Sequence, residues 1–215
     1  MNWSDIGKGF LELLAPSVCP GCDLPSGNPH QSGFCGACLP LLEEVSTALA
    51  PPASVAAVYV YGGPLAEAIL RLKYHGRTEI APVLGKLLSQ AALPYIETID
   101  VVMPVPLYPR RLRARGFNQA ALLATPVSRR LGLPLDVMAL SRVRDTAEQA
   151  GIDREQRALN VKGAFRARPP RRPERVLLVD DVRTTGATLA AASQALLEAG
   201  YSSVHALALA GTRPG

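Results

Sequence analysis

An unbroken apolar run that leads into two adjacent aspartates is the feature that most constrains the fold. The stretch from Val176 to Leu189 reads VLLVDDVRTTGATL. Because VLLV does not alternate with polar residues, it predicts a central strand that is buried on both faces and ends at Asp180. The following segment predicts a helix from Ala187 to Ala199. Asp180 and Asp181 are therefore expected at the carboxyl edge of an α/β sheet, where such folds bind ligands.

The loop between this strand and helix reads RTTGAT. Free backbone N–H groups at a helix N-terminus bind anions, and a glycine allows close approach, so the loop predicts a phosphate site. Asp180 and Asp181 could accept hydrogen bonds from a sugar diol and hold Mg²⁺ through water. Neither a Walker A motif nor G-x-G-x-x-G is present, which favours a sugar phosphate. The alternative is an ordinary turn, with Thr184 or Thr185 as N-cap and solvated aspartates.

The four cysteines form two C-x-x-C pairs, Cys19 with Cys22 and Cys35 with Cys38. Each pair can present both sulfurs on one side of a tight turn, so that four thiolates converge on one tetrahedral ion. We expect a structural zinc site, closed by its four ligands and therefore not catalytic. A pair of disulfides and a redox-active C-x-x-C are the alternatives.

The sequence changes character near Ala50. Residues 1–50 are expected to form a short N-terminal helix and the zinc module, and residues 51–215 a second domain. From Ser54 onward, short apolar runs alternate with amphipathic segments, which predicts a mostly parallel sheet flanked by helices. Strands are expected at 54–61 and 100–105, and helices from Pro64 to about Gly76, over 80–92, and in a segment that ends at Gly132.

Basic residues outnumber acidic ones, which gives a formal net charge of +5, and most of them are arginines. Four of them fall close together, at Arg110, Arg111, Arg113 and Arg115. Arginine makes bidentate contacts with phosphate, so this group is a candidate surface for single-stranded nucleic acid. A solvated basic face is the alternative.

The first sixteen residues contain apolar side chains, but Asp5, Lys8 and Glu12 interrupt them. A secretory signal needs an uninterrupted apolar core, and a membrane span needs a longer one. We therefore expect a cytoplasmic protein without membrane insertion.

Several motifs together resemble one family. VLLVDDVRTTGATL resembles the 5-phosphoribosyl-1-pyrophosphate (PRPP) motif of type I phosphoribosyltransferases. CPGC with CGAC, LKYHG, PVPLYPRRLRARGFNQA and RDTAEQAGIDREQRALNVKGAF precede it in the order found in the ComF family, so the chain is similar to that family from about Cys19 to Gly211. The resemblance implies a zinc ribbon fused to a domain with the type I phosphoribosyltransferase fold, which is α/β.

The resemblance also implies roles for individual residues. Asp180 and Asp181 would contact the ribose hydroxyls and Mg²⁺, and Lys73 could reach phosphate or merely complement a helix dipole. Residues 142–165 would form the flexible catalytic loop, in which Gln149 and Arg157 either contact ligand or only tie down the loop. The 5-phosphate would lie on Arg183, Thr184, Thr185, Gly186, Ala187 and Thr188, and pyrophosphate on Pro106, Leu107 and Tyr108.

Two functions from different classes follow from the resemblance. In the first, the protein binds PRPP with Mg²⁺ and acts in natural competence, where it handles incoming single-stranded DNA alongside the competence machinery. In the alternative, it is an active phosphoribosyltransferase that transfers phosphoribosyl from PRPP to an unidentified nitrogen nucleophile. Because type I phosphoribosyltransferases are often dimers, a homodimer is also possible.

Overall fold

The computed structural model describes residues 18–25, 33–45, 53–146 and 161–212. The expected N-terminal helix and the 50/51 domain boundary lie outside these residues. None of the helices in the described ranges is long and apolar enough to cross a membrane.

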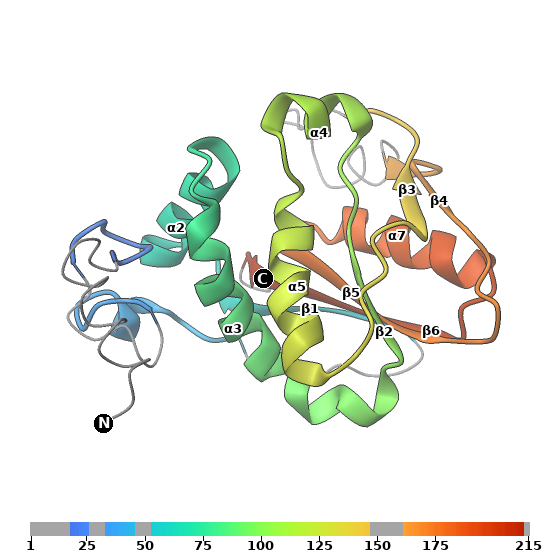
Figure 1. Ribbon diagram of the computed structural model, residues 1–215, viewed down its shortest axis with the longest axis horizontal. Coiled ribbons are helices and arrows are strands. Elements are labelled where there is room, and N and C mark those ends of the chain that lie inside the picture. The colour runs from blue at the N-terminus through green and yellow to red at the C-terminus, as the bar shows by residue number, and fades with distance from the viewer. Residues whose placement is uncertain (1–17, 26–32, 46–52, 147–160, 213–215) are drawn as a thin grey trace, which may run out of the picture.

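A parallel four-stranded sheet with the strand order β1-β6-β5-β2 forms the centre of the molecule (Figure 1). Both central strands are almost completely buried, which confirms the interpretation of VLLV as a strand covered on both faces. The expected strands at 54–61 and 100–105 are also confirmed as β1 and β2. The strands are β1 (Ala53–Val60), β2 (Val101–Pro104), β5 (Arg175–Arg183) and β6 (Ser203–Gly211).

The strand β5 is longer than predicted, because it does not end at Asp180 but continues to Arg183. The neighbouring strand β6 stays paired with β5 over this extension, with Asp180 opposite Ala208 and Arg183 opposite Gly211. On the other side the pairing with β2 stops where Pro104 lies opposite Val179. Backbone pairing on one side is enough to carry the strand onward. The two aspartates therefore lie in a strand and not in a loop.

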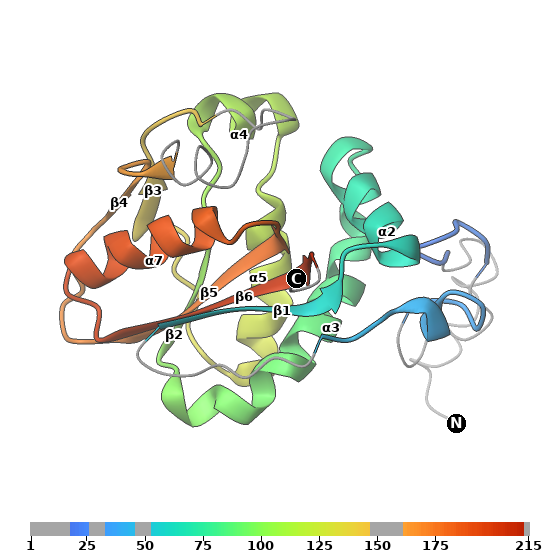
Figure 2. The ribbon, with the colours of Figure 1, turned by 180° about the vertical axis from the view of Figure 1, so that it is seen from behind.

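Helices cover both faces of the sheet (Figures 1 and 2). On one face α3 and α5 pack against β5 and β6, and α2 joins the same apolar core. On the other face lie α7 and the two-stranded antiparallel sheet of β3 and β4. The helices are α2 (Gly63–Tyr74), α3 (Ala81–Ala92), α4 (Pro109–Arg115), α5 (Gln119–Leu131) and α7 (Ala187–Glu198), and the short strands are β3 (Leu140–Arg142) and β4 (Phe165–Ala167).

The helices expected from sequence are confirmed to within a few residues, and their ends have the expected causes. Pro64 stands in the first turn of α2, where a missing N–H costs nothing. Gly76 and Gly132 follow α2 and α5 with φ of +64° and +66°, the left-handed conformation that ends a helix. The pairing of β3 with β4 was not predicted, because three-residue strands carry too few positions for a pattern.

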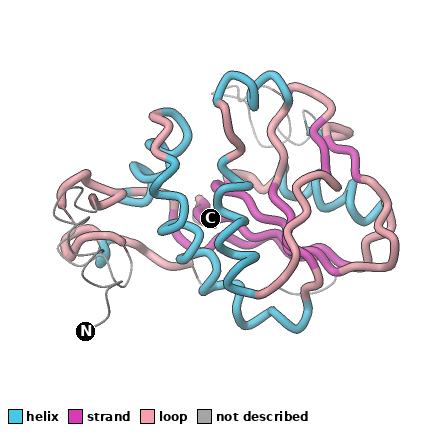
Figure 3. The backbone as a smooth tube through the Cα atoms, viewed as in Figure 1, coloured by secondary structure: helices cyan, strands magenta, loops and turns pink. Residues whose placement is uncertain are grey.

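The cysteine-bearing segment is attached to the sheet by backbone hydrogen bonds. Val45 donates to the carbonyl of Val58 at 2.8 Å, and Val60 donates to the carbonyl of Glu43 at 2.8 Å. These bonds add residues 43–45 to the outer edge of β1, so that the edge strand is covered. Figure 3 shows this segment at the side of the molecule, beyond α2 and next to the strands.

The helices α3 and α5 pack closely against each other at Gly85. A Cβ atom at Gly85 would lie 2.9 Å from the carbonyl oxygen of Leu123 and against the ring of Pro126. Gly85→Ala should therefore destabilise the protein by about 1–3 kcal/mol through overpacking. This exceeds the gain of about 0.5–1 kcal/mol that alanine normally brings to a helix.

Urea unfolding of the Gly85→Ala protein measures this effect. Gly36→Ala serves as the control, because a Cβ atom at Gly36 would meet nothing within 4 Å. Equal or greater stability of the Gly85→Ala protein would contradict the packing argument.

Candidate functional site

The two aspartates at the carboxyl end of β5 are almost completely buried. Asp180 is 7 % exposed and Asp181 is 3 % exposed. The backbone N–H of Asp181 donates to Oδ1 of Asp180 at 2.9 Å. This burial contradicts the alternative in which the pair is a solvated partner of a helix dipole. Carboxylates are seldom buried unless they are paired, so their neighbours define the site.

Asp181 has a cationic partner from a different part of the fold. Nζ of Lys73, in the last turn of α2, lies 2.5 Å from Oδ2 of Asp181. The Lys73 side chain is itself only 14 % exposed. The structure thus brings together two residues that the sequence had placed in one site, and Lys73 does not merely complement the dipole of its own helix.

A polar chain continues from Asp181 to α4. Nε2 of Gln119, at the start of α5, lies 3.4 Å from Oδ1 of Asp181. Oε1 of Gln119 accepts from Nη1 of Arg115 at 2.5 Å. The Arg115 guanidinium in turn lies 5.6 Å from the ring centre of Tyr74, the neighbour of Lys73. Asp181 on β5 is therefore contacted from α2 and α5 directly, and from α4 through Gln119.

The two carboxyl groups have opposite pKa shifts. Burial and the neighbouring Asp181 charge raise the pKa of Asp180 well above its usual value. Burial also acts to raise the pKa of Asp181, but the charge and hydrogen bond of Lys73 outweigh it and lower that pKa. Of the two, Asp181 is therefore the carboxyl group that ionises more readily. Lys73 balances the charge of only one carboxylate, so ionisation of both would require an additional cation.

The loop after β5 has the geometry of an anion site. Gly186 has φ of +80°, which favours glycine, and it is the N-cap of α7. Oγ1 of Thr185 accepts from the N–H of Ala187 at 3.3 Å. The alternative of an ordinary turn placed Thr184 or Thr185 at the N-cap, and the structure contradicts this because the N-cap is Gly186. The first turn of α7 presents N–H groups without acceptors inside the helix. These groups can bind phosphate next to Asp181.

The segment Pro106–Tyr108 lies on the β2 side of the same site. The N–H of Val105 donates to the carbonyl of Val179 at 2.8 Å, so the segment leaves β2 directly beside Asp180. Nδ2 of Asn118 donates to the carbonyl of Val105 at 3.0 Å and holds the turn. The structure therefore places the candidate pyrophosphate segment next to the aspartates.

The four clustered arginines do not form one uniform surface. Arg110 and Arg113 are exposed on α4. Arg111 instead pairs with Asp145 at 3.2 Å and donates to the carbonyl of Thr146 at 2.9 Å. Arg115 is held by Gln119. Only two of the four candidate nucleic-acid contacts are thus directed to solvent.

Two further candidates, Gln149 and Arg157, lie outside the described residues. The structure does describe both ends of their segment, at Thr146 and Val161. Arg111 holds the first of these ends through Asp145 and Thr146.

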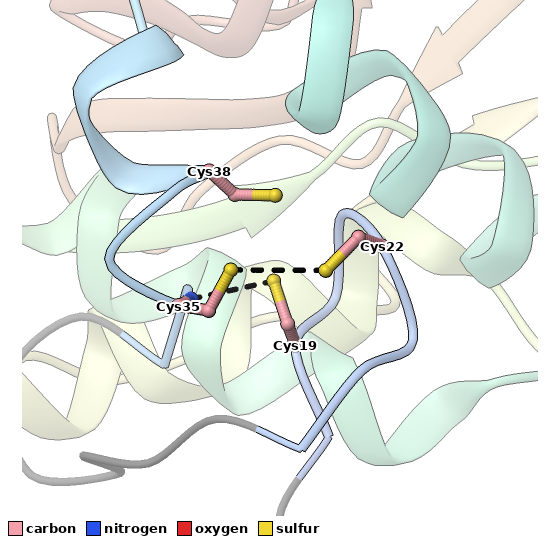
Figure 4. A group of neighbouring side chains, drawn as sticks. All are labelled: Cys19, Cys22, Cys35 and Cys38. Carbon is pink, nitrogen blue, oxygen red and sulfur yellow. Dashed lines mark hydrogen bonds between the residues drawn. The ribbon is translucent and has the colours of Figure 1, made fainter.

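The four cysteines form a compact cluster at the side of the molecule (Figure 4). Their sulfur atoms all lie within 4.8 Å of one another, and Sγ of Cys22 and Sγ of Cys35 are 3.7 Å apart. A tetrahedral ion with zinc–sulfur bonds of about 2.3 Å separates neighbouring sulfurs by about 3.8 Å. All four thiols are free, which excludes the disulfide alternative in this structure. The donor set therefore fits one tetrahedral metal ion.

Hydrogen bonding prepares the cluster for a cation. The N–H of Cys35 donates to Sγ of Cys19 at 3.3 Å. The N–H of Cys38 is the main cause that lowers the pKa of Cys35 to about 7, while burial raises the pKa of Cys38. Four thiolates can ionise together only around a positive charge, which a bound metal supplies.

Sequence reasoning missed Gln119 as a member of the site. It lies in the segment GFNQA, directly after the arginine group, and nothing in its spacing indicates contact with Asp181. Only the packing of α5 against β5 brings it there.

Comparisons with known proteins agree with this geometry. The phosphoribosyl transferase domain family model matches residues 118–214. The match covers α5, β5, the loop and α7, and together with the parallel sheet it confirms the type I phosphoribosyltransferase fold with a four-cysteine module before it. The glutamine PRPP amidotransferase structure from Bacillus subtilis is 24 % identical, with a TM-score of 0.42, and covers 60 % of this chain and 26 % of its own.

The curated relatives match nearly the full length. DNA utilization protein YhgH of Salmonella typhi is 37 % identical over 91 % of this chain and 85 % of its own length. Competence protein F of Haemophilus influenzae is 31 % identical over 94 % of both chains. The chain therefore belongs to the ComF family, which includes competence protein F and the DNA utilization protein YhgH.

Proposed function

We propose that this protein binds PRPP together with Mg²⁺ at the carboxyl end of β5 and acts in natural competence, where it handles incoming single-stranded DNA. The observation that carries the proposal is a buried carboxylate pair, Asp180 and Asp181, followed directly by the glycine loop and the N-terminus of α7. Such an arrangement matches a ligand that carries a sugar diol and a phosphate a few ångströms apart.

Each part of PRPP has a partner in this arrangement. The ribose hydroxyls would donate to Asp180 and Asp181, and the 5-phosphate would accept from the N–H groups between Thr184 and Thr188. Pyrophosphate would lie beside Pro106–Tyr108. Mg²⁺ would supply the positive charge that Lys73 alone does not provide. Lys73 can then contact either Asp181 or a ligand phosphate, because its flexible side chain carries a point charge.

The four cysteines would hold a structural zinc ion. A closed set of four thiolates leaves no position for water or substrate, so the ion would maintain shape and not take part in chemistry.

The first prediction from the proposed function concerns Asp180, which accepts the Asp181 N–H and whose pKa is raised by burial and by the Asp181 charge. Asp180→Asn keeps the shape and the acceptor oxygen but removes the ionisable group. PRPP affinity should fall about 10- to 100-fold, the effect of losing a hydrogen bond to a charged group. The unliganded protein should become more stable, by about 0.5–2 kcal/mol, because an uncharged amide replaces a buried carboxyl group that lies beside a second carboxylate.

Calorimetric titration with PRPP and Mg²⁺, together with thermal unfolding, measures both effects. Asp180 is the better single target, because Asp181→Asn would leave Lys73 buried without its carboxylate. Asn at both positions should abolish binding. Unchanged affinity in the Asp180→Asn protein would refute the site.

The second prediction is a pH dependence. The raised pKa of Asp180 means that binding, which needs an ionised acceptor, must release a proton. PRPP affinity should therefore rise as the pH is raised above the ordinary carboxyl range and through the raised pKa of Asp180, and the contribution of Asp180 to the stability of the unliganded protein is lost over the same rise. Titrations in two buffers of different ionisation enthalpy measure the released proton directly. Proton uptake on binding, or equal release by the Asp180→Asn protein, would contradict the assignment.

The proposed DNA surface is α4, which carries the exposed Arg110 and Arg113 next to the ligand site. The relatives are named for competence and for DNA utilization, which supports a role with DNA. Arg111 is less suited to this role, because it holds Asp145. Competence proteins would be the partners in the cell, and the DNA would be bound mainly through its phosphates.

The third prediction tests this surface. The logarithm of affinity for single-stranded DNA should fall linearly with the logarithm of salt concentration, with a slope of about −0.7 for each phosphate contact. Arg110→Gln with Arg113→Gln should therefore reduce the slope by about 1.4. The matched control is Arg129→Gln with Arg130→Gln, at the far end of α5, where both arginines are exposed. An unchanged slope in the first variant, or an equal change in both, would exclude α4 as the DNA surface.

A further inference from the structure

The loop Cys19–Asp23, which we call the first knuckle, is a tight turn that packs against α2. The N–H of Asp23 donates to the carbonyl of Cys19 at 2.9 Å, and the N–H of Cys19 donates to the carbonyl of Leu24 at 2.8 Å. Asp23 has φ of +59°, and no other non-glycine residue in the described ranges has a positive φ. A residue in this sparsely populated conformation is kept there by its surroundings.

Those surroundings are residues of α2 and the turn after it. Nη1 of Arg71 donates to the carbonyl of Pro20 at 2.7 Å, and Nε of Arg71 lies 3.4 Å from Oδ2 of Asp23. Nη1 of Arg77 lies 3.0 Å from Oδ1 of Asp23. The first knuckle is therefore bound to the carboxyl end of α2 by charged groups.

The amino end of α2 also touches the first knuckle. A Cβ atom at Gly21 would lie 2.6 Å from Cβ of Pro64, so the backbone of the knuckle packs directly on the first turn of α2. Cys19 and Cys38 belong to the same apolar core as Leu65 and Leu72 of α2. A shift of the cysteine cluster would therefore also displace α2.

The same helix carries Lys73 into the ligand site. Residues two positions apart on a helix point about 200° away from each other, so Arg71 and Lys73 lie on opposite sides of α2. Arg71 faces the first knuckle, Lys73 faces Asp181, and Leu72 between them is fully buried. α2 is thus a rigid connector with the cysteine cluster on one side and the carboxylate pair on the other.

We propose that Arg71 is a positioning residue: through its contacts with Pro20 and Asp23 it fixes α2 and so places the Lys73 ammonium on Asp181. Metal in the cysteine cluster and ligand in the phosphoribosyl site are then energetically coupled through α2. Loss of metal loosens the first knuckle, releases α2 and withdraws Lys73. The predicted effect on ligand affinity rests on the proposed function, whereas the placement of Lys73 by Arg71 does not.

The coupling between the two sites can be expressed as a fold-change in affinity, and it is reciprocal. Couplings between two sites in proteins commonly change affinity by about 5- to 150-fold, and each ligand changes the affinity of the other by the same factor. Arg71→Ala and removal of the metal by a chelator should therefore each lower PRPP affinity within this range. PRPP with Mg²⁺ should in turn slow the release of zinc to a colorimetric chelator.

The deciding experiment measures Lys73 itself. Lysines of the full-length protein are labelled with an amine-reactive reagent, and the labelling rate of each is followed by mass spectrometry. In the unaltered protein Lys73 is protected by Asp181 and by burial, while the exposed Lys86 provides the reference rate. Arg71→Ala and metal removal should each raise the Lys73 rate severalfold and leave the Lys86 rate unchanged.

The matched control is Glu67→Ala, which truncates an exposed side chain on the same helix without touching the first knuckle. It should change neither the Lys73 rate nor PRPP affinity. In addition, Arg71→Ala should cause no further loss of PRPP affinity in the Lys73→Met background, because two substitutions are non-additive when one residue acts through the other.

Three outcomes would overturn the inference. The first is an unchanged Lys73 labelling rate in a folded Arg71→Ala protein, and the second is an additive loss of PRPP affinity in the Lys73→Met background. The third is global unfolding on both Arg71→Ala substitution and metal removal, which would mean that the first knuckle stabilises the whole fold. If the unaltered protein fails to bind PRPP, the proposed function fails, and the labelling rates still decide the role of Arg71.

Discussion

The ion pair between Lys73 and Asp181 is the interaction on which the rest of this structure depends. It joins α2, at one edge of the molecule, to β5 at its centre, and it lies where burial makes an unpaired charge costly. Gln119 bridges Asp181 to Arg115, and the pKa of Asp180 is raised by burial and by the Asp181 charge. Fold stability and ligand recognition therefore compete for the same few atoms.

This competition would favour the proposed binding of a magnesium complex of a sugar phosphate. In the unliganded protein, burial and the adjacent Asp181 charge raise the pKa of Asp180. A ligand that brings a divalent ion would offset these two effects and leave both carboxylates ionised to accept hydrogen bonds from ribose hydroxyls. The proposed phosphate loop would need no comparable adjustment, because Gly186 already has a positive φ and stands at the N-terminus of α7, whose first N–H groups can bind an anion.

Much of this arrangement could be predicted from sequence where the physical cause is local. The buried run before Asp180, the glycines that end α2 and α5, and the paired cysteines each act over a few residues, and the structure confirms them. Features that depend on contacts distant in sequence could not be predicted. The extension of β5 to Arg183 depends on the length of β6, and the division of the arginine group depends on Asp145 and Gln119. The contact of Arg71 with the first knuckle spans 51 residues and leaves no pattern in the chain.

The central claim is that the carboxyl end of β5 is a PRPP site that requires Mg²⁺. The most direct measurement is a calorimetric titration of the zinc-loaded, full-length protein with PRPP, first with Mg²⁺, then with a chelator of Mg²⁺, and finally with single-stranded DNA present. The account predicts saturable binding of one PRPP per chain that disappears without Mg²⁺ and changes when DNA is bound. Absence of binding heat with Mg²⁺ at millimolar PRPP, confirmed by an unchanged melting temperature, would contradict it.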